Sequence, residues 1–357
     1  MFRLWFNEVF CENVFVMSKN MENILKLRRN ETRDIVKRIG AITADRLHLA
    51  NFPLGRPTVV FNATIFFDED SFEVYARIIM GYYTYASAIV KFFIPLEELY
   101  EITQSHFTAN ILISPENKYD IWGTEDPRAT EVRGKRIITY TGRTINFFDP
   151  HIRIERTLPI ICIEENNIWR KIAVFKLRNV EIVSNKDAFL VDIEGLKLFH
   201  RPHTSGPKEE HFCAISEVPD DILEEKEFKE IELDTMKIVL EPAPFEEKIG
   251  WGTPPVKVDD EYLLLLHATD KEMRWYRVFA VLMDEKCNVT AVTPYYIMKP
   301  KENYERYGDR PLVVFPCGAA IIDDELIISY GAAAVSYTHL RAHETEADLV
   351  CRLLLEK

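Results

Sequence analysis

The chain has 357 residues, 47% of them hydrophobic, and a formal net charge of −13 at pH 7. A chain of this length can bury a sizeable core, as one large β domain or as two smaller domains. The acidic balance disfavours nucleic acid as a partner, because binding a phosphate backbone needs a basic surface. It still permits a local cationic pocket for a small anion.

The cysteines and the N-terminal residues indicate a cytoplasmic protein. Six cysteines are scattered without a CxxC pair, which is typical of reduced thiols. Residues 1–16 are apolar but carry Glu8 and Glu12 and lack a small-residue cleavage site, so they do not resemble a signal peptide. No apolar run is long enough to span a membrane. We therefore expect a cytoplasmic protein with no membrane partner, and a homo-oligomer stays an open alternative.

In chain order, helical apolar spacing comes first and strand patterns follow. Residues 18–39 carry apolar residues at helical spacing, which predicts an N-terminal helical arm within residues 1–46. Strands are expected at 57–61, 73–85, 111–114, 136–141, 144–148, 160–163, 172–175, 180–183, 196–199, 263–267, 277–283, 312–315 and 326–330, and short helical turns at 95–102 and 221–228. Many short strands with turns between them predict an all-β domain, either a sandwich or a propeller.

The stretch GTEDPR at residues 123–128 has the composition of a preorganised acid. Glu125 and Asp126 stand side by side before Pro127 and Arg128. Proline fixes its own φ and disfavours helical backbone at the residue before it. This predicts a rigid turn leading into a strand, with Arg128 close enough to hold a carboxylate or a substrate oxygen. A plain Asp-Pro turn is the structural alternative.

Other polar residues stand at the ends of predicted strands, where a propeller would bring them to its central channel. They are Asn62, Arg77, Arg201 and His267. Taken singly, each is also compatible with an ion pair or a satisfied core position. The group of His200, His203, His211 and Cys213 matches no standard zinc spacing, so no metal is expected.

Several blocks together resemble glycoside hydrolase family 130, the mannoside phosphorylases and their β-mannosidase relatives. The blocks are FNA at 61–63, YAR at 75–77, GTEDPR at 123–128, NKDA at 185–188 with LFHRP at 198–202, KIG at 248–250 through LH at 266–267, and VFPCGA at 314–319 with SYGAA at 329–333. The resemblance implies an all-β fold, a five-bladed β-propeller over residues 47–333 that follows an N-terminal helical arm.

The resemblance also implies roles for the matching residues. Asp126 corresponds to the general acid, and Asn62 and Arg77 correspond to positions of the mannosyl subsite. Glu125 and Arg128, beside the acid, are expected to bind substrate as well. The implied phosphate-binding set is Lys186, Arg201, Lys248, His267 and Tyr276.

The implied reaction is inverting phosphorolysis of a β-mannoside to α-mannose 1-phosphate and a shortened sugar. Inorganic phosphate is the co-substrate, and no cofactor is expected. An inverting phosphorylase needs one acid, whereas an inverting hydrolase also needs a base that activates water. In the mannosidase branch the cationic positions are replaced, notably by acidic residues, so their presence here favours phosphorolysis. A β-mannosidase is the first alternative. A non-catalytic glycan-binding propeller is the second, and Asp126 together with Lys248 and His267 argues against it. The linkage stays open.

The end of the chain departs from the family pattern. Ala334 stands where the family has Asp after Gly331-Ala332-Ala333, and residues 335–357 resemble translated sequencing-adapter DNA. We expect a non-native tail over residues 334–357 and a last blade that is incomplete. A genuine C-terminal helix is the alternative, because the leucines near the end are compatible with a helix.

Overall fold

The computed structural model describes residues 14–17, 21–81, 85–145, 154–204, 211–322, 325–333 and 350–353. Within these ranges the helices are short: α2 (Met21–Leu27), α3 (Asn303–Arg306) and the 3-10 turns η2 (Ala44–Arg46), η3 (Leu96–Glu98) and η4 (Asp220–Glu224). The predicted all-β class is confirmed. The turn η3 falls within the predicted helical turn at 95–102, and η4 overlaps the one at 221–228. No helix in this part of the chain has the length and apolar character needed to cross a membrane.

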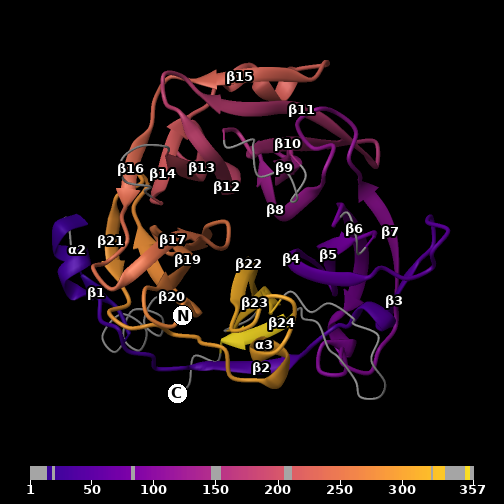
Figure 1. Cartoon of the computed structure of the whole chain (residues 1–357), viewed down its shortest axis with the longest axis horizontal. Helices are drawn as coiled ribbons and strands as arrows, with labels where there is room; N and C mark the ends of the chain where they lie inside the picture. Colours follow the sequence, from indigo (N-terminus) through magenta and orange to yellow (C-terminus); the bar gives the residue numbers. More distant parts are fainter. Residues whose placement is uncertain are drawn as a thin grey trace.

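The strands form five sheets, each named here after the strand that lies nearest the middle of the molecule (Figure 1). The β4 sheet contains β4 (Val59–Asp68), β5 (Ser71–Ile79), β6 (Ser87–Pro95), β7 (Phe107–Ile113) and β3 (Leu47–Leu49). The β8 sheet contains β8 (Thr124–Val132), β9 (Lys135–Arg143), β10 (Thr157–Glu165), β11 (Ile168–Leu177) and β15 (Lys229–Leu233). The β12 sheet contains β12 (Ile182–Asp192), β13 (Leu196–Thr204), β14 (Cys213–Glu217) and β16 (Lys237–Leu240).

The last two sheets include strands from the ends of the chain. The β17 sheet contains β17 (Glu246–Trp251), β19 (Glu261–Asp270), β20 (Tyr276–Met283), β21 (Val289–Val292) and β1 (Val16–Met17), with β18 (Val256–Val258) paired to β19. The β22 sheet contains β22 (Val314–Ile322), β23 (Glu325–Ala332), β24 (Val350–Leu353) and β2 (Val36–Gly40).

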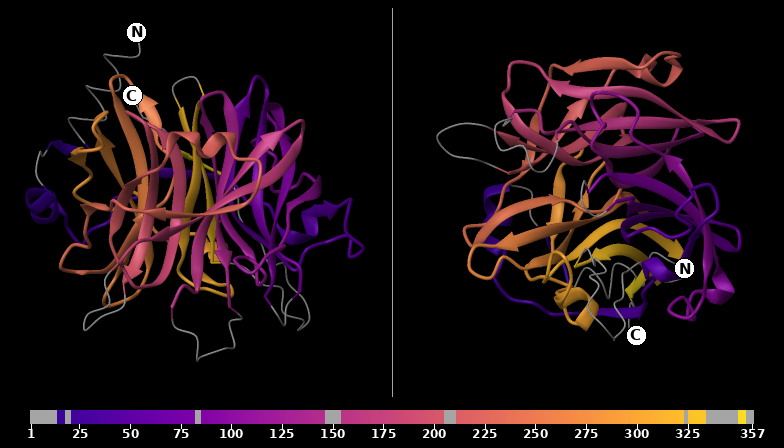
Figure 2. Two further views of the ribbon diagram at one scale, coloured as in Figure 1. Left: turned by 90° about the horizontal axis from the view of Figure 1, so that it is seen from above. Right: turned by 45° about the vertical axis from the view of Figure 1, so that its right-hand side comes forward.

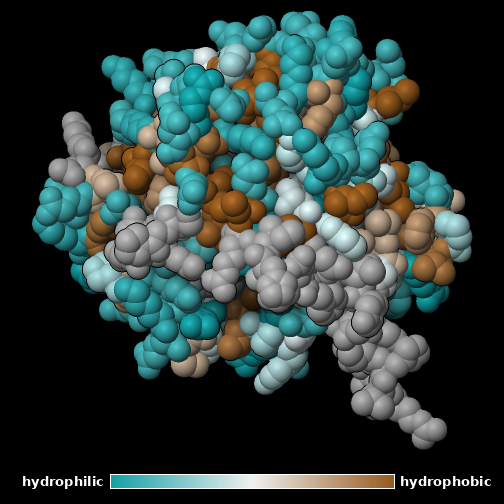
Figure 3. Space-filling view, turned by 45° about the horizontal axis from the view of Figure 1, so that its top comes forward, coloured by the Kyte–Doolittle hydropathy of each residue, from teal (hydrophilic) through white to brown (hydrophobic). Residues whose placement is uncertain are grey.

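These sheets surround a common axis in a propeller-like arrangement, and their strands run between the two faces of the molecule (Figures 1 and 2). Apolar side chains fill the space between neighbouring sheets. Leu190 and Leu198 of the β12 sheet, for example, share one cluster with Ile161 and Phe175 of the β8 sheet. Hydrophilic side chains dominate the described surface in Figure 3, with hydrophobic groups between them. The core therefore lies between sheets, and the axis is left to polar side chains.

The N-terminal segment contains less helix than predicted. Helix α2 ends at Leu27, and Val36–Gly40 is the strand β2. Val36 is buried among residues of the β17 and β22 sheets, including Val278 and Ile328. Tertiary burial therefore overrides the helical spacing of this stretch.

The β22 sheet takes its outer strands from both ends of the chain. Strand β24 pairs with β23 on one side and with β2 on the other. The expected gap in the last blade is not present in the structure, because β24 covers an edge of β23 that would otherwise expose unpaired backbone groups. Residues 350–353 are strand, not the alternative C-terminal helix. Residues 334–349 and 354–357 of the predicted tail lie outside the described residues.

Each innermost strand carries a shift of register near the middle of the molecule. The shifts lie between Phe61 and Thr64, Glu125 and Arg128, Lys186 and Phe189, Glu246 and Lys248, and Pro316 and Gly318. In three of them a polar residue has left-handed backbone: Asn62 (φ 50°), Asp126 (φ 51°) and Asp187 (φ 51°). Bulges re-aim side chains, and such backbone costs of order 1–3 kcal/mol for a residue other than glycine. The predicted Asp-Pro turn is thus a bulge within the strand β8.

Candidate active site

A pocket of about 580 Å³ opens near the middle of the ring, lined by residues of all five innermost strands. Most of the residues predicted from the sequence line it: Asn62, Arg77, Glu125, Asp126, Lys186, Arg201, Lys248 and Tyr276. Asp187, Arg143, Arg274, Tyr85, Asp309 and Arg310, which were not predicted, line it as well. The structure therefore brings together polar residues that lie up to 248 positions apart in the chain, from Asn62 to Arg310.

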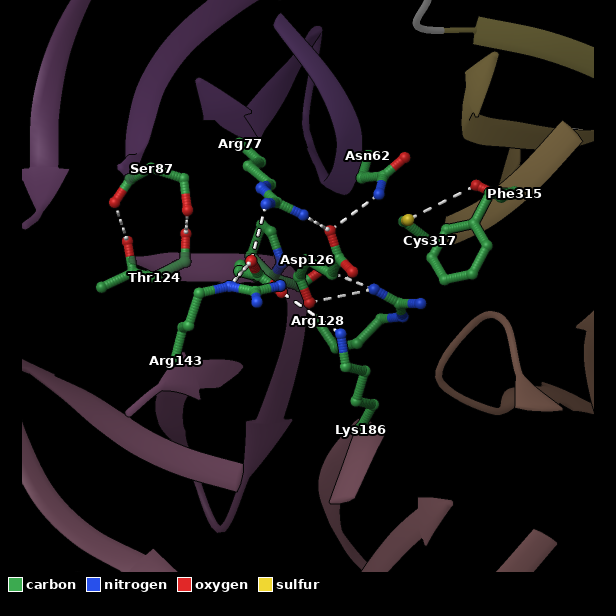
Figure 4. Close-up of polar contacts among 12 residues, drawn as sticks. Asn62, Arg77, Ser87, Thr124, Asp126, Arg128, Arg143, Lys186, Phe315 and Cys317 are labelled. Atoms are coloured by element: carbon green, nitrogen blue, oxygen red, sulfur yellow. Dashed lines mark hydrogen bonds and ion pairs between the residues drawn. The ribbon is translucent and has the colours of Figure 1, made fainter. Parts of the chain in front are cut away.

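Asp126 is held through one of its two carboxylate oxygens. Its Oδ1 accepts hydrogen bonds from Asn62 Nδ2 at 2.7 Å and Arg77 Nη1 at 3.0 Å (Figure 4). No described residue engages Oδ2 in a hydrogen bond or ion pair, and the side chain is 9% exposed. This arrangement fixes the carboxyl group while one oxygen stays available to a bound molecule.

Glu125 is tied down by three cations. Its Oε1 accepts hydrogen bonds from Arg77 Nη2 at 2.7 Å and Arg143 Nε at 2.6 Å, and Lys186 Nζ lies 3.4 Å from Oε2. Burial by itself opposes ionisation of Glu125, but Arg143, Arg77 and Lys186 outweigh it and hold the pKa well below its usual range. Glu125 is therefore a fixed anion that orders the surrounding cations.

Lys186 is the most easily deprotonated of these cations. Its side chain is 25% exposed and faces Glu125. Burial lowers the pKa of Lys186 to about 8. The nearby Arg143 and Arg201 also lower this pKa, whereas Glu125 raises it. Its charge thus depends on pH in a range where the arginines stay charged.

Asp187 organises the opposite side of the pocket. Its Oδ2 accepts from Arg201 Nε at 2.5 Å and lies 3.3 Å from His267 Nε2. Burial would raise the pKa of Asp187, but Arg201 and His267 outweigh it and lower the pKa. Asp187 therefore orients Arg201 as a fixed anion.

His267 lies behind Asp187, not on the pocket wall. It is 1% exposed, and its ring packs against Phe315 at 4.4 Å between centroids. Burial lowers the pKa of His267 more than Asp187 raises it, so the imidazole is neutral. Its predicted role as a direct phosphate ligand does not match this position, because Asp187 and the surrounding rings enclose it.

Lys248 is a cation with no carboxylate bonded to it in the described ranges. Its Nζ lies 5.0 Å from the centroid of the Tyr276 ring. The acidic residues nearby pair with other cations: Glu246 with Arg28, Glu247 with Arg274 and Asp270 with Arg277. Cation–π contact with an aromatic face leaves the ammonium hydrogens available to an anion.

Lys248 lies in the strand β17 together with Gly250. A Cβ atom at Gly250 would lie 2.4 Å from Asp187 Oδ2 and 2.5 Å from His267 Nε2. The glycine is thus needed for the close approach of these two side chains, and not for a turn.

Arg128 occupies a different position from the one predicted. It is fully buried, does not line the pocket, and donates hydrogen bonds to backbone carbonyls. Contact with a substrate oxygen is therefore not available to it.

The histidines near residue 200 form no metal site. His200 is hydrogen-bonded to Asn185 and Ser216, and His203 stacks on His211 with centroids 4.0 Å apart. Across the described ranges, no three His, Cys, Asp or Glu side chains are placed to hold a metal ion together.

Comparison with known proteins decides the family. The family model of glycoside hydrolase family 130, described as β-1,4-mannooligosaccharide phosphorylase, matches residues 26–344. The chain belongs to glycoside hydrolase family 130. Over 228 residues, which are 62% of this chain and 69% of the relative, it is 31% identical to a 1,2-β-oligomannan phosphorylase of Thermoanaerobacter sp. strain X514. A β-1,2-mannobiose phosphorylase of the same strain is 27% identical over 82% of this chain and 91% of its own length.

Solved structures share the fold of this family 130 protein. The β-1,2-mannobiose phosphorylase of Listeria innocua, in complex with β-1,2-mannobiose, superposes with a TM-score of 0.61 at 19% identity, over 83% of this chain and 89% of that one. A family 130 glycoside hydrolase that targets β-1,2 mannosidic linkages in Candida mannan superposes with a TM-score of 0.58 at 17% identity. The superposition covers 82% of this chain and 83% of that one.

Two residues at the centre of this family 130 site were missed in the sequence. Arg143 ends the strand β9 after Thr141 and Gly142, so it lacks the preceding apolar run that singled out Arg77. Asp187 is followed by Ala188, just as Asn62 is followed by Ala63 and Asp126 by Pro127. This pattern of a polar residue before a small or rigid one marks the bulges and was available for detection.

Proposed function

We propose that this chain catalyses inverting phosphorolysis of a β-mannoside, forming α-mannose 1-phosphate and a shortened sugar. A phosphate oxygen attacks the anomeric carbon from the face opposite the leaving sugar. The bond between that carbon and the leaving oxygen breaks, and the leaving oxygen gains a proton supplied by Asp126. Asn62 and Arg77 orient Asp126 and line the mannosyl subsite.

The observation that carries the proposal is the set of cations facing Asp126 in the same pocket. Lys248 lies there without a bonded carboxylate, and Arg201 is oriented by Asp187. Cations at close range repel one another, and a bound anion offsets this repulsion. Arginine offers a forked pair of donors and lysine a point charge, which suits a phosphate ion. The ring of Tyr276 packs against the ammonium group of Lys248.

The other pocket carboxylates favour phosphorolysis over hydrolysis. An inverting hydrolase needs a carboxylate base for water. The lowered pKa values of Glu125 and Asp187 make both weak bases. Glu247 pairs with Arg274, and Asp309 accepts a hydrogen bond from Tyr85. Phosphate needs no such base because it is already nucleophilic.

We also propose that the ring is a five-bladed propeller in which each of the five sheets is one blade. The equivalent register shifts in all five innermost strands support this count. In this proposal the β22 sheet is the fifth blade, closed by β2 from the N-terminal part of the chain.

The direct test measures initial rates on β-1,2-mannobiose with and without inorganic phosphate, and follows the product by NMR. We expect no turnover without phosphate and the α anomer of mannose 1-phosphate with it. Mannose released at the full rate without phosphate, and no sugar phosphate when phosphate is added, would support the β-mannosidase alternative.

The Lys248→Ala variant tests the phosphate side of the pocket. Hydrogen bonds to charged groups contribute about 1.5–3 kcal/mol. We therefore expect the KM for phosphate to rise about tenfold or more, with a much smaller change in the KM for the mannoside. Lys257→Ala is the matched control, because Lys257 is exposed in β18 and does not line the pocket. Equal changes in both KM values for Lys248→Ala would argue against phosphate binding at this residue.

A further inference from the structure

Arg128 makes an unusual set of contacts for a buried cation. Its Nη1 donates to the carbonyls of Asp126 at 3.0 Å and Pro127 at 3.2 Å. Its Nε donates to the Gly252 carbonyl, and its Nη2 lies 3.5 Å from the Pro316 carbonyl. None of these partners is a carboxylate. The guanidinium binds the backbone of β8, of β22 and of Gly252, which directly follows β17.

These contacts fix the bulge that holds Asp126. The Asp126 backbone is left-handed, which a residue other than glycine keeps only when its surroundings over-determine it. Two of the Arg128 hydrogen bonds end on the bulge itself, while the others tie it to the β17 and β22 sheets. The face of Phe315, 5.4 Å from the guanidinium carbon, covers the same group. Figure 4 shows Arg128 next to Asp126 and Phe315.

Along β8, Arg128 stands between residues that line two different cavities. In β8, Glu125 and Asp126 line the pocket described above, whereas residues 129–131 line a second cavity of about 250 Å³. The strand β22 repeats this order, with Phe315 at the first cavity and Gly318 at the second. Fully buried Arg128 lies between the two stretches of β8.

We propose that Arg128 is a positioning residue for the general acid: it clamps the Asp126 bulge to the neighbouring sheets and so fixes the carboxyl group that supplies the proton. It does not touch substrate. This inference rests on the proposed function only in that Asp126 is the acid. An error of about 1 Å in the placement of a catalytic group can cost 10²-fold in rate.

The test compares two leaving groups in Arg128→Lys, which keeps a charge but loses the fork of donors. With β-1,2-mannobiose the leaving sugar oxygen needs a proton, whereas 2,4-dinitrophenyl β-mannoside leaves without one. We expect kcat to fall at least about tenfold on mannobiose, by the same positioning argument, and to recover most of that loss on the dinitrophenyl substrate. Asp126→Asn serves as the reference variant, because loss of the acid should likewise lower kcat on mannobiose more than on the dinitrophenyl substrate. The KM for phosphate should change little.

A purely structural role predicts something else. Arg38→Lys is the control, because Arg38 is also buried but binds Asp34 and Glu305 away from the pocket. The Arg38→Lys variant should lower Tm and leave the ratio of the kcat values on the two substrates unchanged. Equal losses on both substrates in Arg128→Lys would overturn the proposal. Should that variant not fold, Arg128→Gln, whose amide still donates to carbonyls, is measured in the same way.

The same assays separate this inference from the proposed function. Wild-type protein is run with and without phosphate beside the variants. Turnover of the wild type without phosphate would contradict phosphorolysis, yet the comparison of leaving groups would stand, because either reaction protonates the leaving oxygen.

Discussion

At the scale of single residues, the carboxylates of the site differ in their hydrogen-bond and ion-pair partners. Glu125 and Asp187 are each neutralised by arginines and serve as fixed anions. Asp126 is bonded through Oδ1 alone. Asp126 is the carboxylate of this group that the sequence singled out as the acid.

Replacing Asp126 with Asn keeps the shape of the side chain and removes the transferable proton. General acid catalysis contributes about 10²- to 10⁴-fold, and we expect kcat on mannobiose to fall by that range. Mannobiose binding should persist, because the amide oxygen of the new Asn can still accept hydrogen bonds from Asn62 and Arg77. Steady-state kinetics and calorimetric titration with mannobiose measure the two effects. Near-normal turnover would remove Asp126 from the role of acid.

The lowered pKa of Lys186 should make the affinity for phosphate depend on pH. With a pKa of about 8, its ammonium is charged below that pH and loses its proton above it. We expect the KM for phosphate to rise as pH increases from about one unit below to about one unit above that value. In Lys186→Arg the guanidinium stays charged, so the rise should disappear. A rise of equal size in both proteins would assign the effect to another group.

At the scale of elements, bulges in neighbouring sheets fit into one another near the axis. The Oδ1 of Asn62, in the β4 bulge, lies so close to Gly331 of β23 that a Cβ there would come within 1.7 Å of it. The same Cβ would lie 2.9 Å from the Asn62 backbone nitrogen. A methyl group at this position must therefore move the bulge that orients Asp126.

Gly331→Ala tests this fit between elements. Overpacking of this kind costs about 1–3 kcal/mol of folding free energy, so Tm should fall. Because Asn62 is displaced from Asp126, we expect kcat to fall about tenfold or more as well. Gly55→Ala is the control, since the nearest atom to its Cβ is 3.5 Å away. A loss of Tm with unchanged kcat per folded molecule would show that the bulge tolerates the shift.

At the scale of the whole molecule, the ring is held by strands from both ends of the chain. The N-terminal segment is anchored by Arg28, whose Nη2 lies 2.7 Å from the buried carboxylate of Glu246 at the start of β17. The strand β2 reaches the β22 sheet only through β24. Closure of the ring thus involves the segment that resembles adapter DNA.

Deleting residues 335–357 tests whether that segment belongs to the fold. We propose that it does not, and that β2 pairs directly with β23 once β24 is removed, because both strands then expose complementary edges. Tm measured by calorimetry and the oligomeric state measured by light scattering should stay unchanged. A lower Tm together with aggregation would establish β24 as part of the native sheet.

The sequence alone determined the fold class and most of the pocket. Short strands of β-branched and aromatic residues specify an all-β domain locally. Polar residues that follow apolar runs, such as Asn62 and Arg201, mark the axis, but they lie within strands and not at the predicted strand ends. Tertiary structure decided which of these residues face the pocket. His267 lies behind Asp187, and Arg128 binds the carbonyl of Gly252, a residue far away in the chain. Helical spacing at Val36 gave way to burial between sheets. The physical reason is that a bulge and its partners depend on the register between strands and on contacts across sheets, and local sequence preferences do not encode either.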